Sequence, residues 1–237
     1  MSDTTARGSS AAARANETSD EPAHNQKPRP YHHGSLPQAL LAAAEAVLQR
    51  EGIGGLTLRA IAREAGVSHT APQHHFGDTA GVLSELAATG FLRLSASLAR
   101  HAEGATGTAE RRSAIAHGYI DFARKNPDLM RLMSRGEMFD PNRPSLIEAR
   151  RVAALALAGV FSDEAAAPPS GTDAFGPMDA TRAVALTAAW AYVHGLALLL
   201  IDGRLNGLAA SAQGIRDADE LVAAAIDHVQ LTPGKVT

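Results

Sequence analysis

Three histidines lie within one short stretch of the chain, AREAGVSHTAPQHHF, at residues 62–76. His69, His74 and His75 are five positions and one position apart, and Asp78 is the only carboxylate close by. Imidazoles in such a cluster could bind a metal ion, transfer protons, or recognise another molecule. Neighbouring residues of a helix point about 100° apart, so His74 and His75 cannot both face one ion, and the spacing argues against a metal site.

The elements that carry these histidines are predicted to be short helices. An apolar stripe over residues 35–52 predicts a first helix, and Thr57 is placed to cap a second one that Gly66 ends. Ser68 can cap a third helix within residues 68–75. A tight glycine turn between two short helices, braced by a preceding helix, is the layout of a helix-turn-helix module.

A helix-turn-helix places its second helix in the major groove of DNA, where short polar side chains reach base edges. Pro72 pushes the residue before it out of the α region, which favours a start of that helix nearer Thr70 than Ser68. His75, next to Phe76, is expected to pack at the turn. The residues expected to contact DNA are Thr57, Arg59, Ser68, His69, Thr70, Gln73, His74 and Thr79.

The module is not basic. Residues 34–78 contain three arginines and four carboxylates, and the whole chain has a formal net charge of −3. Phosphate contacts would therefore depend on hydroxyls, amides and helix N-termini, with Lys27 and Arg29 of the preceding segment in reach of the DNA backbone. Histidine adds positive charge only when protonated, so we expect DNA affinity to rise as the pH falls from 8 to 6.

The rest of the chain is also helical by its pattern, and the fold class is all-α with about nine helices. Ser145 and Glu148 have the spacing of a capping box at the start of one of them. The predicted organisation is a disordered arm at 1–33, a DNA-binding domain at 34–94 and a larger domain at 95–237. No long stretch alternates between apolar and polar residues, the pattern that would predict a β-strand.

Several function classes are excluded by what the sequence lacks. It has no cysteine, no G-x-S-x-G, no phosphate-binding glycine loop and no H-E-x-x-H, so we expect no enzyme, no catalytic residues, no cofactor and no metal. The first 34 residues contain no apolar signal-peptide region. The most apolar window, 187–201, is shorter than the roughly 20 residues that span a membrane, and predicts a buried helix in a cytoplasmic protein.

The stretch LLAAAEAVLQREGIGGLTLRAIAREAGVSHTAPQHHFGDTAGVL resembles the DNA-binding domain of the TetR/AcrR family of bacterial transcriptional regulators. The apolar helix, the segment LTLRAIAREAGVS, the short helix ending in HF and the D…L opening of a longer helix follow that family's order. Two positions depart from it: Gln73 stands where the family commonly has an aromatic residue, and Thr79 where it has a lysine. Gln73 could instead make a bidentate contact to adenine.

A second stretch, WAYVHGLALLLIDGRL, resembles the ligand-binding domain of TetR-like regulators named for a Trp-His-Gly signature, here Trp190, His194 and Gly195. The resemblance implies that the surrounding helices enclose a pocket for a small, largely apolar or aromatic effector. The alternative for each lining residue is ordinary core, and for His194 a hydrogen-bonded core position. The expected pocket residues are Phe122, Met130, Met133, Met138, Phe139, Trp190 and His194.

The same resemblance implies that the helix at 179–202 and the last helix pack against their twins in a homodimer, which would carry two recognition helices. The expected interface residues are Leu198, Leu200, Ile201, Leu221, Val222, Ala225, Ile226 and Val229. The predicted function is a ligand-responsive repressor that binds a palindromic operator and is released by its effector. The alternative is an all-helical small-molecule-binding or interaction protein without sequence-specific DNA binding.

Overall fold

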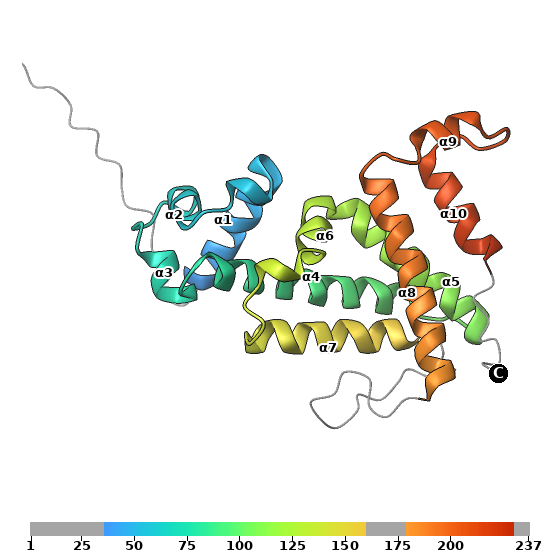
Figure 1. Cartoon of the computed structure of the whole chain (residues 1–237), viewed down its shortest axis with the longest axis horizontal. Coiled ribbons are helices and arrows are strands. Elements are labelled where there is room, and N and C mark those ends of the chain that lie inside the picture. The colour runs from blue at the N-terminus through green and yellow to red at the C-terminus, as the bar shows by residue number, and fades with distance from the viewer. Residues whose placement is uncertain (1–35, 160–178, 230–237) are drawn as a thin grey trace, which may run out of the picture. The chain divides into compact units, whose positions relative to one another are not determined.

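The computed structural model describes residues 36–159 and 179–229, and these residues form helices and turns without a strand (Figure 1). The predicted all-α class is confirmed. The described residues contain ten α-helices instead of the expected nine or so. The additional one is the short helix at Asn206–Ser211, whose sequence has no apolar stripe that would predict a helix. The elements are α1 (Leu36–Glu51), η1 (Ile53–Gly55), α2 (Leu58–Ala65), α3 (Ala71–Phe76), α4 (Thr79–Ala102), α5 (Thr108–Lys125), α6 (Pro127–Met133), η2 (Gly136–Met138), α7 (Pro144–Ala158), α8 (Ala180–Ile201), α9 (Asn206–Ser211) and α10 (Ala218–His228).

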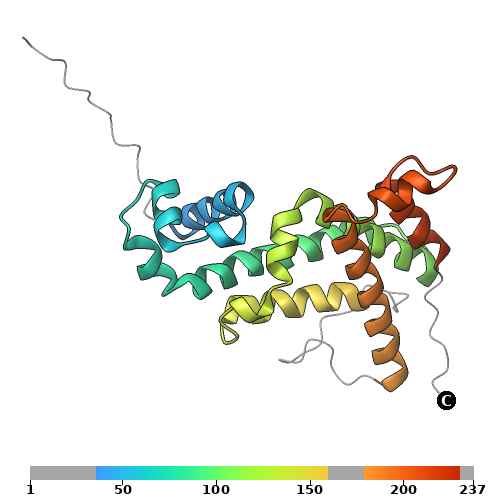
Figure 2. The same ribbon diagram turned by 45° about the horizontal axis from the view of Figure 1, so that its top comes forward.

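Helix α4 is the element against which five of the other helices pack. Its most extensive contacts are with α5 and α7, and it also touches α1, α3 and α6. Figure 2 shows it continuing from the end of α3 to the region between α5 and α7. Leu86, Ala87 and Leu98 on this helix are almost completely buried. The predicted boundary between residues 94 and 95 therefore falls inside a continuous helix, and the predicted arm at 1–33 lies outside the described residues.

Aspartate side chains cap the starts of three helices, α4, α8 and α10. The side chains of Asp78, Asp179 and Asp217 each accept a hydrogen bond from a backbone N–H three residues on, at 2.8, 2.8 and 2.9 Å. The capping box predicted at Ser145 is wrong: α7 starts one residue earlier, at Pro144, whose fixed φ suits the first helical position. The buried Ser145 hydroxyl has no hydrogen-bond partner among the described residues.

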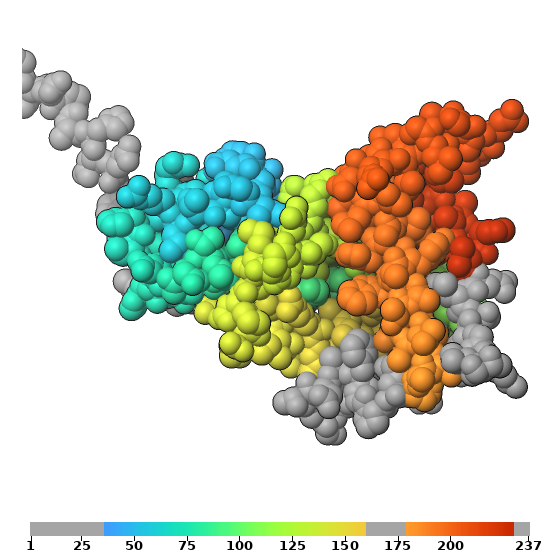
Figure 3. Space-filling model, in the orientation of Figure 1, coloured from blue at the N-terminus to red at the C-terminus, as the bar shows by residue number. Residues whose placement is uncertain are grey.

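Two helices, α4 and α8, are long and apolar enough to cross a membrane by length and composition alone. For α4 that property reflects its place in the core, since 56% of its most apolar window is buried. For α8 only 22% of the window is buried, so the chain itself covers little of this helix. Figure 3 shows α8 running along the molecular surface. Its apolar face is left for another surface to cover.

Candidate nucleic-acid interface and ligand-binding region

Helices α2 and α3 form the predicted helix-turn-helix. The Thr57 side chain accepts a hydrogen bond from the Ala60 N–H at 3.1 Å, which confirms Thr57 as the cap of α2. Gly66 ends the helix at φ 67°, a left-handed conformation that favours glycine, and the Val67 N–H reaches back to the Ala62 carbonyl at 3.0 Å. This turn sets the direction of the segment that leads into α3.

Helix α3 begins at Ala71, later than a helix capped by Ser68 would. The Ser68 hydroxyl lies 2.9 Å from the Thr70 hydroxyl, and the Ala71 N–H bonds to the Ser68 carbonyl at 3.0 Å, so Ser68 to Ala71 form a turn ahead of the helix. The preference of Pro72 for the first helical turn explains the later start. Pro72 and Phe76 are buried and hold the helix against its neighbours.

The outer face of this module gathers the residues that were predicted to contact DNA. Seven of the eight are exposed, and Thr79 is half-buried at the first position of α4. The expectation that His75 packs at the turn is wrong, because Pro72 and Phe76 fill the inner positions of this two-turn helix and His75 is left exposed. The exposed set is Thr57, Arg59, Ser68, His69, Thr70, Gln73 and His74.

Ion pairs within the module distinguish its three arginines. Arg50 lies 2.8 Å from Glu64 and 3.0 Å from Glu51, and Arg63 lies 4.0 Å from Glu51. Hydrogen bonds from Arg50 to Glu64 and Glu51 raise the pKa of its guanidinium further. Arg59 forms no ion pair with any described residue and is exposed one position after the start of α2. Its positive charge is thus the least compensated on this face.

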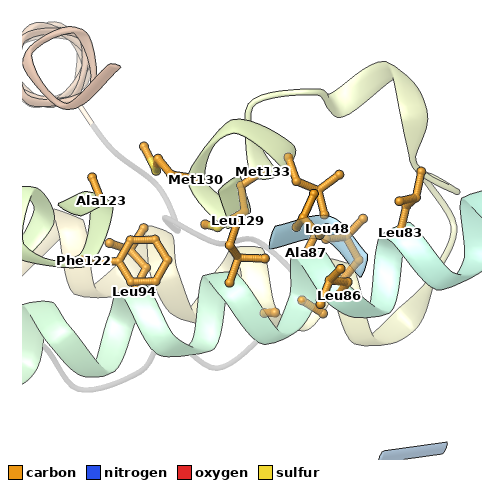
Figure 4. Close-up of a cluster of buried hydrophobic side chains, with 14 of the residues drawn as sticks. Leu48, Leu83, Leu86, Ala87, Leu94, Phe122, Ala123, Leu129, Met130 and Met133 are labelled. Atoms are coloured by element: carbon orange, nitrogen blue, oxygen red, sulfur yellow. The ribbon is translucent and has the colours of Figure 1, made fainter. Parts of the chain in front are cut away.

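The seven residues predicted to line a pocket do not occupy one environment. Four of them are at most 8% exposed and belong to the core packed on α4, as Figure 4 shows for those that it labels. Met138 and His194 are half-buried, and the Trp190 side chain is 53% exposed. The four core residues are Phe122, Met130, Met133 and Phe139.

His194 belongs to a small polar and aromatic cluster that joins α5 and α8. Its Nδ1 lies 2.9 Å from the Tyr119 hydroxyl, and its ring centroid lies 6.2 Å from those of both Tyr119 and Trp190. Burial raises the pKa of Tyr119 to about 12 and lowers the pKa of His194, so both are neutral at pH 7. Sequence reasoning assigned no such role to Tyr119, because its partner lies 75 positions further along the chain.

A cavity of about 270 Å³ opens where α5, α7, α8 and α10 converge. None of the seven predicted pocket residues lines it. The walls combine apolar side chains such as Val193 with polar ones at Ser113, Tyr192 and Asp227. Asp227 is already engaged, since it accepts hydrogen bonds from Ser113 at 3.0 Å and from His117 at 3.1 Å. Only tertiary packing brings these helices together, so no local sequence signal marked the cavity.

The predicted interface residues of α8 and α10 divide into two groups, one buried in the chain's own core and one partly exposed. Val222 and Ile226 are at most 6% exposed and pack into the chain's own core, so they offer nothing to a second copy. The six others are half-buried: Leu198, Leu200, Ile201, Leu221, Ala225 and Val229. Towards its N-terminal half α8 also exposes small or apolar residues that are not among the predicted ones, namely Ala183, Val184, Thr187, Ala188 and Ala191.

The fold and this surface define an all-helical DNA-binding regulator with an N-terminal helix-turn-helix and a C-terminal helical domain. Residues 40–86 match the family model for bacterial regulatory proteins of the tetR family, and residues 113–229 match a tetracyclin repressor-like C-terminal domain. The chain belongs to the TetR family of transcription regulators.

Several solved structures share the fold of this chain. A protein of unknown function from Rhodococcus sp. RHA1 is 38% identical over 84% of this chain and 95% of its own, with a TM-score of 0.63. Two further structures share the fold at low identity. They are the TetR family regulator PfmR from Thermus thermophilus (19%, covering 79% and 94%, TM-score 0.53) and the fatty acid degradation regulator FadR from Bacillus halodurans (14%, covering 83% and 94%, TM-score 0.57). None of the curated proteins gives a significant match.

Proposed function

We propose that this regulator is a ligand-responsive repressor, which binds a palindromic operator as a homodimer and is released by a small, largely apolar or aromatic effector. The observation that carries the proposal is the exposed polar face of α3 and its preceding turn, set by Thr57 and Gly66. A repressor acts where the chromosome lies, so the proposed location is the cytoplasm. The proposed organisation is an N-terminal arm at 1–33, a DNA-binding domain at 34–94 and an effector-binding and dimerisation domain at 95–237.

Base recognition is assigned to α3 and its leading turn. Five polar residues are exposed there and can reach base edges in a major groove: Ser68, His69, Thr70, Gln73 and His74. Gln73 is suited to a bidentate contact with adenine. Backbone contacts are assigned to three residues outside that face, namely Thr57, Arg59 and Thr79.

The homodimer is assigned to the uncovered faces of α8 and α10. The most apolar window of α8 is 22% buried, and an apolar helix exposed to that degree calls for a covering partner. Ala188 and Ala191 on the exposed face allow a second helix to approach closely. Two copies joined in this way would present two α3 helices to DNA half-sites about one helical turn apart, or a multiple of that.

The effector site is assigned to the region between α5 and α8, where the cavity and the Tyr119–His194 pair lie. Trp190, His194 and Gly195 of α8, which carry the resemblance to the Trp-His-Gly type, are included in this proposed site. An effector releases DNA only to the extent that it binds the non-binding arrangement of the dimer more tightly. Effector binding that left operator affinity unchanged would contradict the repressor mechanism.

Titration of a labelled duplex from the gene's own upstream region tests DNA recognition, with a scrambled duplex as control. Gln73→Ala should cost about 1–3 kcal/mol on the upstream duplex and little on the scrambled one, as loss of a base contact does. Arg59→Ala should weaken both duplexes and reduce the slope of log K against log salt by about one, as loss of a phosphate contact does. Equal binding of both duplexes by the wild type would refute sequence-specific recognition.

The histidines add a pH arm to the same titration. If His69 and His74 face the DNA, affinity should rise between pH 8 and pH 6, and the double variant His69→Asn, His74→Asn should lose most of that rise. His101, which is on α4 and hydrogen-bonds to the Ser97 carbonyl, provides a control as His101→Asn. Affinity that is flat across this pH range in the wild type would remove the histidines from the interface.

A further inference from the structure

We propose that Arg143 is a positioning residue for DNA recognition: its guanidinium ties the C-terminal end of α3 to the loop that enters α7. The orientation of the recognition helix is then set from the ligand-binding part of the chain. This inference rests on the proposed role of α3 in reading DNA. It concerns Arg143, Glu85 and Phe76, none of which the sequence had marked as functional.

The guanidinium of Arg143 bridges two helices. Its Nε donates to Glu85 Oε1 of α4 at 2.7 Å, and its Nη1 lies 3.5 Å from the carbonyl oxygen of Phe76, the last residue of α3. The side chains of Arg143 and Glu85 are 23% and 22% exposed, so water screens this pair less than it screens the other ion pairs on the surface. A helix leaves its last carbonyls without internal partners, and a fixed cation there is a favourable neighbour.

The loop that carries Arg143 is itself held to α4. The Asp140 N–H donates to the Ser84 hydroxyl at 2.9 Å, and that hydroxyl donates to the Ala80 carbonyl at 2.7 Å. Ser84 is completely buried. Because Ser84 and Glu85 are neighbours on α4, the loop is anchored at two adjacent points of the same helix.

The sequence of the loop, DPNRP, limits its freedom further. The Asp140 side chain accepts a hydrogen bond from the Asn142 N–H at 3.0 Å, which fixes a turn just before Arg143. Pro141 and Pro144 have restricted φ angles on either side of that turn. A loop of this kind transmits a displacement of α7 instead of absorbing it.

The end of α3 has little room to move independently of α4. A Cβ added at Gly81 would lie 2.0 Å from the Phe76 carbonyl oxygen and 3.5 Å from Arg143 Nη1, which shows how closely the three groups approach. The N-terminal side of the loop carries Phe139, which is buried, and Met138, two residues that the sequence predicted to line the effector pocket. A rearrangement of those residues would therefore reach α3 through Arg143.

The experiment uses the full chain and the labelled upstream duplex. Arg143→Gln should weaken binding about tenfold, or ~1.4 kcal/mol, while the slope of log K against log salt stays unchanged because no phosphate contact is lost. The DNA affinity of Arg143→Lys should lie between those of the wild type and Arg143→Gln, since an ammonium cannot make the forked contact of a guanidinium. In the Glu85→Gln background, Arg143→Gln should cause little further loss.

Arg151→Gln is the matched control. Arg151 lies on α7 itself, and its guanidinium pairs with Glu148 of the same helix at 2.8 Å. It should leave DNA affinity unchanged. Hydrogen exchange at the Gly77 amide, which bonds to the Gln73 carbonyl at 2.8 Å, should accelerate in Arg143→Gln and not in Arg151→Gln.

Three results would overturn the inference. The first is a DNA affinity of Arg143→Gln equal to that of the wild type, and the second is an equal loss of DNA affinity in Arg151→Gln. The third is a slope of log K against log salt that is reduced by about one in Arg143→Gln, which would make Arg143 a phosphate contact. If the wild type binds no DNA, the proposed function fails. The exchange measurement then decides the positioning role alone, since an unchanged rate at Gly77 would refute it and a faster rate would support it.

Discussion

The close approach of Gly81 to α3 makes the substitution Gly81→Ala a sharp test of how the recognition helix is held. Gly81 is buried in the first turn of α4, and its N–H donates to Asp78 at 2.8 Å. An alanine Cβ at this position would lie 2.0 Å from the Phe76 carbonyl oxygen and 3.1 Å from the carbonyl carbon. The obstacle is backbone, which cannot rotate away as a side chain would, so α3 or α4 must shift.

Two opposing contributions set the expected size of the effect. Replacing a helical glycine by alanine stabilises a helix by roughly 0.5–1 kcal/mol. Forcing an extra carbon into an occupied site costs about 1–3 kcal/mol and occasionally more. Because a contact of 2.0 Å is far inside van der Waals distance, we expect the upper half of that cost. The net loss in the free energy of unfolding is then ~1–2.5 kcal/mol, or a melting temperature lower by roughly 2–10 °C.

The assay is urea unfolding followed by circular dichroism, together with titration of the upstream duplex. Gly195→Ala is the control, because Gly195 also lies within a long helix but an added Cβ meets nothing within 4 Å in the chain. The control should be as stable as the wild type or more so. Gly81→Ala should lose stability and also bind the duplex more weakly, since Phe76 moves with α3. If Gly81→Ala matched the wild type in stability and affinity, the packing argument for the junction of α3 and α4 would be refuted.

Three further predictions concern the cap at Thr57, the exposed face of α8 and the half-buried His194. Thr57→Ala should lower the free energy of unfolding by ~1 kcal/mol through loss of the α2 cap, while Thr57→Ser should not, as measured in urea. Ala188→Glu should convert the proposed dimer to a monomer in light scattering, whereas Ala105→Glu, between α4 and α5, should leave it intact; an unchanged mass for Ala188→Glu would exclude this face. Because burial lowers the pKa of His194 below its unfolded value, the folded state resists protonation. Stability should be complete above about pH 6.5 and fall below it. His194→Gln should flatten that fall, and an identical pH profile would remove His194 as its source.

The part of the fold that could be predicted from the sequence is the part that depends on near neighbours. The caps at Thr57 and Asp78 need an N–H three residues on, and the turn at Gly66 needs one residue that tolerates positive φ. The all-α class and the helix-turn-helix follow from such signals. Where a prediction was wrong, at His75 and Ser145, a nearby proline had moved the helix start and with it the inward positions.

The candidate ligand region was less accessible to sequence reasoning. Methionines and phenylalanines on amphipathic helices satisfy the same pattern whether they line a pocket or fill a core, and Met130 and Phe122 are in the core. The Tyr119–His194 hydrogen bond spans 75 positions, and the cavity draws on four helices. No short window contains the information that brings such residues together.

The sequence by itself determined where most helices begin and end and which residues form the recognition turn, because hydrogen bonds within one turn and apolar periodicity are local properties. The regulator class came from the resemblance of two stretches to the TetR/AcrR family, and the family models agree with it. The tertiary structure alone decided that Arg143 meets Glu85 across 58 positions, that Val222 faces inward, and that α8 keeps an uncovered apolar face. Those outcomes depend on how helices that are distant in the sequence fit against one another. Close packing is a property of all the side chains at once.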